Sequence, residues 1–248
     1  MNLRENLSCS QVVLGVLVAA GLAATPATAS IIQSVSGTSS AGVAFVFDAR
    51  LTISGNTLTV VLENNSTVRT QNPADLLTSF YFDIKNSLNV RPTLTYASAT
   101  GGVWLTSRNN TDVLQSGTAN LMAVNPNDNT WQFKTFNAGS NPFLGFGIGT
   151  AGNSALRSNG FNGNITGGFD YSIYAGDITT QNLSNTLLVK NSATFVFTGV
   201  SGFSEADIVP RSVFGLGTAP DSVVAFVPAP GAAACLGIGG LLAMRRRR

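Results

Sequence analysis

VAFVFDARLTISGNTLTVVLEN, residues 43 to 64, is the stretch that decides the fold, because its apolar side chains recur at every second position. The apolar set is Val43, Phe45, Phe47, Ala49, Leu51 and Ile53, and it resumes after a turn with Leu58, Val60 and Leu62. The intervening positions of the first run include Asp48, Arg50 and Thr52. Between the runs, Ser54-Gly55-Asn56 supplies residues that tolerate the positive φ of a tight connection. The stretch therefore predicts a β-hairpin with one buried face.

The rest of the chain repeats this two-residue period in short runs and shows almost no helical period. Further strands are expected at residues 80–85, 94–96, 103–105, 131–136, 169–174, 187–198, 213–216 and 223–227. One helical turn is expected at 74–77, after Pro73, and the longest Gly- and Asn-rich loop at 139–168. About eight to eleven strands would form a single antiparallel β-sandwich, with a jelly roll as one arrangement that fits. We therefore predict an all-β protein whose sandwich covers residues 30–222.

The composition fits an exported β protein. Only 10% of residues are charged, against about 25% in ordinary globular proteins, while 44% are hydrophobic, which is enough to build a core. Of 14 Lys and Arg residues, Arg4 and Arg245–Arg248 lie in the end segments, and of 12 acids only Glu5 does. The body therefore carries nine basic and eleven acidic residues. This balance argues against nucleic acid as a partner, because nucleic acid requires a basic patch.

Residue types that carry much enzyme chemistry are missing from the body. The chain has no histidine, and its two cysteines, Cys9 and Cys235, lie in the end segments. The body therefore has no thiolate nucleophile, internal disulfide or His/Cys metal site. We accordingly expect no cofactor and no catalytic or metal-binding residues.

Residues 1–29 have the order of features of a secretory signal peptide. Arg4 makes the start positive, and residues 12–24 form an uncharged apolar stretch. Ala27-Thr28-Ala29 then places small residues at the two positions that signal peptidase reads, Ala27 and Ala29. The apolar stretch is too short to span a bilayer, which disfavours a transmembrane anchor. We expect cleavage after Ala29.

The last residues, 223–248, form a tail that contains three consecutive parts. They are the motif Val227, Pro228, Ala229, Pro230 and Gly231, the apolar run 232–244, and the cluster Arg245, Arg246, Arg247 and Arg248. As a helix the apolar run would cover about 20 Å, short of the roughly 30 Å hydrocarbon core. It would lodge near the cytoplasmic face with the arginines held inside. The prolines keep the motif extended, which suits the cleft of a processing enzyme.

This tail resembles the PEP-CTERM sorting signal of Gram-negative bacteria that make extracellular polysaccharide. The usual motif is Val-Pro-Glu-Pro, and the chain has the variant VPAPG, with Ala229 at the glutamate position. The body is also similar to exosortase-dependent surface proteins, over residues 58–66, 74–84, 94–104, 189–203 and 214–222. The resemblance implies that exosortase, a membrane transpeptidase-like enzyme, recognises and cuts the tail after transient insertion in the inner membrane. A plain C-terminal anchor is the alternative.

Three groups of residues in the body are candidate sites. Residues 125–129, NPNDN, are rich in oxygen ligands but lack the Gly and distal Glu of a calcium loop, so a turn is the favoured interpretation. Asp83, Asp170 and Asp177 could serve a glycosidase, but no spacing singles out a pair, and Asp83 is expected on a solvated polar face. The aromatic residues could form a sugar platform, although core packing is favoured and Trp131 is expected to point inward. This last set is Tyr81, Tyr96, Trp104, Tyr171 and Tyr174.

These patterns predict an exported, non-enzymatic protein of the cell surface or extracellular matrix, associated with extracellular polysaccharide. Its partners during export would be signal peptidase and exosortase. A carbohydrate-binding module is the alternative function, and a glycoside hydrolase is a third and weaker one.

Overall fold

The computed structural model describes residues 30–109, 111–122, 130–136, 145–150 and 170–217, together with the backbone of 224–226. These residues form twelve strands and three 3-10 helices, which confirms the all-β prediction. The strands are β1 (Ile31–Thr38), β2 (Ala44–Ser54), β3 (Thr57–Asn64), β4 (Leu77–Phe82), β5 (Thr95–Leu105), β6 (Val113–Asn120), β7 (Gln132–Thr135), β8 (Phe146–Gly149), β9 (Ile173–Tyr174), β10 (Leu187–Thr198), β11 (Val213–Leu216) and β12 (Val224–Phe226). The 3-10 helices are η1 (Pro73–Asp75), η2 (Gln181–Leu183) and η3 (Glu205–Asp207).

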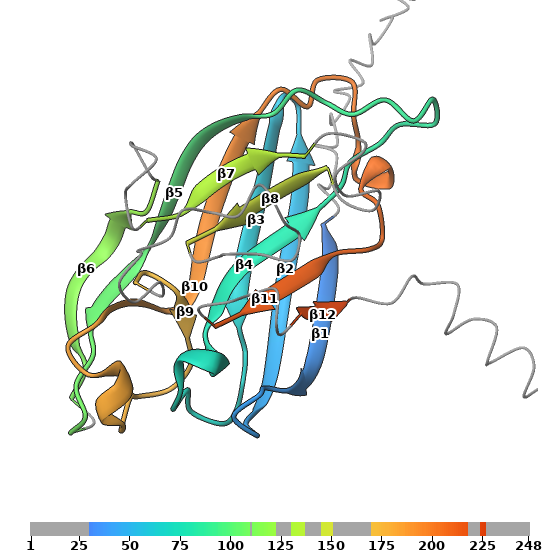
Figure 1. The fold of residues 1–248 in the computed structure, drawn as a ribbon. Helices are drawn as coiled ribbons and strands as arrows, with labels where there is room; N and C mark the ends of the chain where they lie inside the picture. The colour runs from blue at the N-terminus through green and yellow to red at the C-terminus, as the bar shows by residue number, and fades with distance from the viewer. Residues whose placement is uncertain are drawn as a thin grey trace, which may run out of the picture.

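The strands pack as two layers of a β-sandwich (Figure 1). One layer runs β1-β2-β3-β10-β5-β6, and the other contains β7-β8-β4-β11-β12. The short β9 joins the layers, since it pairs in parallel with β10 and antiparallel with β4. Apart from this parallel pairing, the named strands described here pair antiparallel.

Strand β10 is the centre of the larger layer because it has partners on both edges. Along one edge it pairs with β5 from Leu187 to Thr198, with the register shifting between Val189 and Ala193. Along the other edge it pairs first with β9 and then with β3. Asn191 lies at the change of partner with φ of 65°, a left-handed conformation that asparagine adopts more readily than most residues. One strand thus serves two neighbours on the same side.

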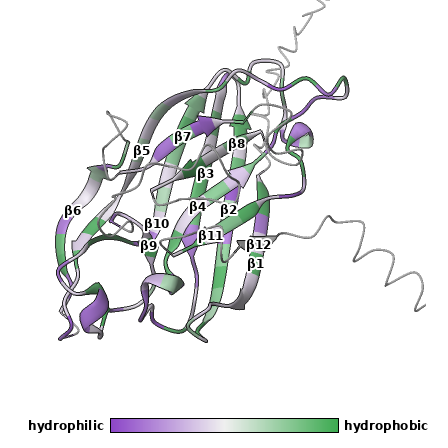
Figure 2. Cartoon of the chain, viewed as in Figure 1, coloured by the Kyte–Doolittle hydropathy of each residue, from purple (hydrophilic) through white to green (hydrophobic). Residues whose placement is uncertain are grey.

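The predicted hairpin is confirmed as β2 and β3. Their ladder runs to Ser54 and Thr57, and Gly55 in the two-residue turn has φ of 59°. Burial alternates along both strands, with Phe45, Phe47, Ala49, Leu51, Ile53, Leu58, Val60 and Leu62 buried. Figure 2 shows the same alternation of hydrophobic and hydrophilic residues along β2 and β10.

Aromatic side chains fill the space between the two layers. Ring pairs cross from one layer to the other at Phe47–Phe214 (6.2 Å between centroids), Phe82–Phe197 (6.3 Å) and Trp131–Phe195 (4.9 Å). Trp131 is fully buried, as expected. Such rings bury much apolar area and gain about 0.5–1.5 kcal/mol per pair beyond that burial, so they account for much of the attraction between the layers.

Several elements differ from expectation. Strand β5 is one continuous strand where two short ones were predicted, and β9 covers only the end of 169–174. The strands β1 and β6 were not predicted, and β8 lies inside the region predicted as the longest loop. Strand β4 is buried at all six positions, because Phe80 and Phe82 face the core and Tyr81, on the opposite face, packs against Phe136. The expectation of one polar face on this strand was therefore wrong.

Candidate functional site

A polar cleft of about 420 Å³ lies where the turn between β5 and β6 meets η2. Its lining comprises Ser107, Arg108 and Asn109 from the turn, and Gln181, Ser184 and Asn185 from η2 and the residues after it. All six carry hydroxyl, amide or guanidinium groups. Figure 1 shows η2 and this turn at the end of the sandwich remote from β1 and β12.

The two walls of the cleft are joined by hydrogen bonds around the buried Thr106. Its backbone N–H donates to the Thr186 carbonyl at 3.0 Å, and its own carbonyl accepts from the Asn185 N–H at 2.9 Å. The Thr106 hydroxyl lies within hydrogen-bonding distance of the Leu183 carbonyl, and it accepts from the Thr186 N–H at 3.1 Å. Asn185 has φ of 60° at this junction. These hydrogen bonds, which we call the Thr106 clamp, hold the two polar segments at a fixed separation.

Asp112 supports the same turn from behind. Its carboxylate accepts hydrogen bonds from the Ser107 N–H at 2.9 Å, the Tyr174 hydroxyl at 2.9 Å and the Ile178 N–H at 3.3 Å. Burial, the hydrogen bond to Asp112 and the nearby carboxylates raise the pKa of Tyr174 above its ordinary value, so this hydroxyl remains a donor. Asp112 is therefore committed to three structural contacts.

A small second core lies beneath this region. It contains Leu76, Tyr174, Ile178, Leu183 and Leu188, and Trp104 packs against it. Leu183 and Trp104 connect this second core to the two segments that line the cleft.

Two cationic side chains, Lys190 and Arg108, lie near this end of the sandwich and differ in whether they already have a partner. Lys190 Nζ lies 2.5 Å from an oxygen of Asp177 and 4.7 Å from the centroid of the Trp104 ring, so its charge is already compensated. Arg108 is exposed, and among the described residues its guanidinium has no hydrogen-bond or ion-pair partner. Arg108 can therefore receive an anionic group, whereas Lys190 is occupied.

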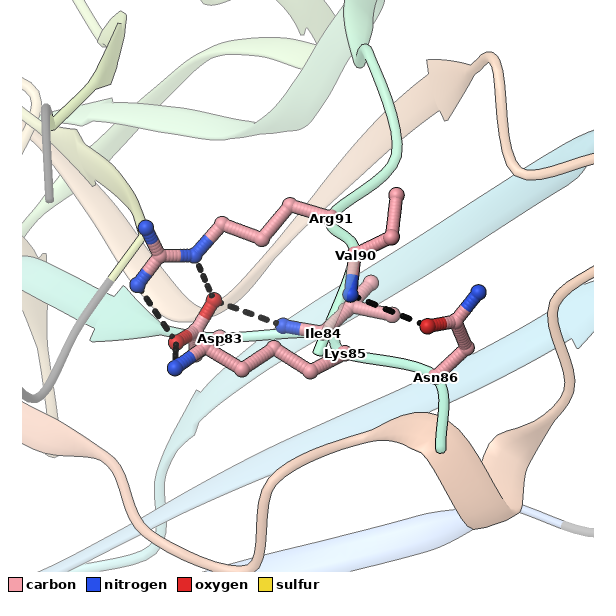
Figure 3. Close-up of polar contacts among 6 residues, drawn as sticks. All are labelled: Asp83, Ile84, Lys85, Asn86, Val90 and Arg91. Atoms are coloured by element: carbon pink, nitrogen blue, oxygen red, sulfur yellow. Dashed lines mark hydrogen bonds and ion pairs between the residues drawn. The ribbon is translucent and has the colours of Figure 1, made fainter. Parts of the chain in front are cut away.

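A second polar cluster surrounds Asp83, and here the sequence-based expectation was wrong. Asp83 was expected on a solvated face, but its side chain is 1% exposed. Arg91 Nε donates to Oδ1 at 2.7 Å and Nη2 donates to Oδ2 at 2.9 Å, so the pair is bidentate (Figure 3). Lys85 Nζ lies 3.5 Å from Oδ2, and the Ile84 N–H donates to Oδ1 at 3.0 Å. The hydrogen bond and charge of Asp83 raise the pKa of Arg91 against the opposing effect of desolvation.

Two of the three candidate carboxylates are engaged in ion pairs. Asp83 is bound by Arg91, and Asp177 is bound by Lys190. Asp170 lies next to a stretch that the structure does not describe, and its backbone carbonyl accepts from the Thr150 hydroxyl at 2.6 Å. Among the described residues, no group of three His, Cys, Asp or Glu side chains is arranged to hold a metal ion. Residues 125–129 lie outside the described residues.

Most of the aromatic candidates are buried or partly buried. Tyr81 and Tyr174 are buried, and Tyr96 stacks on Phe197 with 5.2 Å between ring centroids. Burial raises the pKa of Tyr96, whose hydroxyl donates to the Trp131 carbonyl. Trp104 is half-buried beneath Lys190. Tyr81, Tyr96 and Tyr174 therefore contribute to packing, and Tyr174 also lies 5.7 Å from Lys190 Nζ, measured to its ring centroid.

The sorting residues are not among the residues that the structure describes. Ala27 and Ala29, the motif 227–231, the apolar run 232–244 and Arg245–Arg248 lie outside the described residues. No helix in the described part of the chain is long and apolar enough to cross a membrane.

Sequence reasoning missed the cleft. Its two halves are separated by some seventy residues of chain, and they meet only because Leu105 pairs with Leu187 across β5 and β10. No local pattern marks Arg108 or Asn185 as members of one site. Comparison with known proteins adds no assignment, because no family model, curated protein or solved structure matches the chain.

Proposed function

We propose that this chain is an exported, non-enzymatic protein of the cell surface or extracellular matrix. It is sorted by an exosortase system and associates with extracellular polysaccharide. The tripartite tail is the observation that carries the proposal, together with the signal-peptide features of residues 1–29.

The position of the sheet supports this proposal. Strand β1 begins at Ile31, just after the expected cleavage at Ala29, and β12 ends at Phe226, directly before the motif 227–231. Cleavage after Ala29 and within the motif 227–231 would therefore leave all twelve described strands intact, because β12, although it lies in the predicted tail 223–248, ends before the motif. β1 and β12 also lie close together in the sandwich.

Mass spectrometry of the protein released from the cell surface tests this assignment. A mature product that begins at Ser30 and lacks Arg245–Arg248 is expected. The change Pro228→Ala with Pro230→Ala should leave the chain membrane-held and uncut, as a species a few kilodaltons heavier. Pro220→Ala is the matched control, because it removes a nearby proline outside the motif. A surface-released product that keeps the arginine run would refute exosortase processing and indicate a plain tail.

A carbohydrate-binding module is the second candidate, and the polar cleft favours it. The side chains that line the cleft are those that hydrogen-bond sugar hydroxyls, and its walls are held by Thr106 and Asp112. A glycoside hydrolase has less support, because the carboxylates of Asp83, Asp112 and Asp177 are engaged in structural contacts. A glycan array probed with the full chain separates binding from a purely structural role.

A further inference from the structure

The chemistry of the cleft lining restricts the ligand. Small-molecule sites are mostly lined by apolar and aromatic side chains, but every lining residue here is polar. A ligand that matches this surface must present hydroxyl or charged groups on most of its faces. An apolar peptide side chain has no apolar surface to pack against among these six residues, and a nucleobase has no aromatic ring there on which to stack.

Arg108 adds a requirement for negative charge. Its exposed guanidinium has no partner in the described part of the chain, and arginine binds carboxylates through two parallel hydrogen bonds. The body has nine basic against eleven acidic residues, so a densely charged polyanion would be repelled over the wider surface. A ligand with one carboxylate among many hydroxyls satisfies both conditions.

The cleft is also prepared for binding. The Thr106 and Asp112 contacts hold Ser107 and residues 183–186 in place before a ligand arrives, and preorganisation of this kind lowers the cost of association. Its volume of about 420 Å³ falls within the range of small-molecule sites, about 300–1,000 Å³. The cleft therefore accepts a short segment of a longer chain.

From these observations we infer that the cleft binds a segment of a carboxylated saccharide. Arg108 receives the carboxylate, and the amides of Asn109, Gln181 and Asn185 receive hydroxyl groups. This inference deepens the carbohydrate-binding candidate and rests on it. It names a uronate-type sugar as the ligand class and one arginine as the source of selectivity.

Calorimetric titration of the full chain with a xylo-oligosaccharide that carries a single glucuronate branch, compared with the unbranched neutral xylo-oligosaccharide of equal length, is the first test. Binding of the acidic sugar at least about tenfold tighter is expected, since a hydrogen bond between charged groups contributes that much. Arg108→Gln should remove this preference while leaving the melting temperature unchanged. Arg50→Gln is the matched control, because it removes the same charge at an exposed position of β2, and it should bind like the parent chain.

Asn185→Gly provides a second variant. Glycine accepts the left-handed backbone at this position, so the variant removes the amide without disturbing the turn. It should weaken the binding of both sugars without changing the ratio of their affinities. The inference is overturned if neither sugar binds at millimolar concentration, if both bind equally, or if Arg108→Gln binds the acidic sugar as the parent does. None of these results bears on processing of the tail, which mass spectrometry reads separately.

Discussion

The ion pair between Asp83 and Arg91 offers the sharpest test of the fold. Arg91→Ala would leave a carboxylate that is 1% exposed without its bidentate partner. Removing one member of a buried pair costs about 3–5 kcal/mol, because the remaining charge is uncompensated. The ion pair with Lys85 at 3.5 Å and the hydrogen bond from the Ile84 N–H would still partly compensate the charge of Asp83. We therefore expect a loss of about 3 kcal/mol, the lower end of that range.

Urea denaturation of the full chain measures this loss as a lower midpoint at unchanged m-value. The matched control is Arg50→Ala, which breaks the Arg50–Glu63 pair at 3.9 Å between side chains that are 47% and 28% exposed. Such a surface pair contributes at most about 1 kcal/mol. The double variant Asp83→Asn with Arg91→Ala closes a mutant cycle, and its coupling energy should be about 2 kcal/mol. Equal losses in Arg91→Ala and Arg50→Ala, or an additive cycle, would refute the reasoning.

Three further measurements test other parts of the structure. Gly199 has φ of 102°, and a Cβ added there would lie 2.0 Å from the Thr93 carbonyl oxygen, so Gly199→Ala should cost about 3 kcal/mol or more in thermal unfolding. A Cβ added at Gly117 meets nothing within 4 Å, so the control Gly117→Ala should change stability by less than about 0.5 kcal/mol. Thr106→Val should cost about 1–3 kcal/mol in urea, since it removes the hydroxyl of the Thr106 clamp; an unchanged midpoint would contradict the role of that clamp. The pKa of Tyr96 is raised in the folded state, so the folded protein keeps this proton at pH values above the unfolded pKa of about 10, and its stability should fall as the pH rises beyond that value. Tyr96→Phe should make this decline shallower by about 1.4 kcal/mol per pH unit. An unaltered slope would count against a buried, protonated Tyr96.

Sequence alone predicted the strands that bury one face. The alternation in residues 43–64 and in 187–198 matches the observed burial of β2, β3 and β10, because one side of each strand meets the core. The same rule failed for Asp83. A polar residue between apolar ones normally faces solvent, but the chain after β4 returns Arg91 to the buried carboxylate. The partner lies eight residues away, and no two-residue period can reveal it.

The missed strands have the opposite cause. β6, VLQSGTAN, is mostly exposed on both sides, and among the described strands it pairs with β5 alone, so it carries no alternation to detect. β8, FGIG, is buried at all four positions, and its glycines resemble the loop around it. The cleft could not be predicted because it depends on the pairing of β5 with β10, which is a property of the whole sheet.

β1 and β12 lie close together, on the side of the sandwich away from η2 and the β5–β6 turn, whose residues line the cleft (Figure 1). This arrangement has a mechanical consequence. Tension between a ligand held in the cleft and an attachment beyond Phe226 would travel through the sheet and leave it at β12. That strand has three residues and pairs with β11 from Val213–Phe226 to Gly215–Val224. Under load its few hydrogen bonds would break first, as β12 peels from β11. The aromatic interior would stay packed, so β12 would unfold locally and lengthen the connection beyond Phe226 while the rest of the sandwich stays folded.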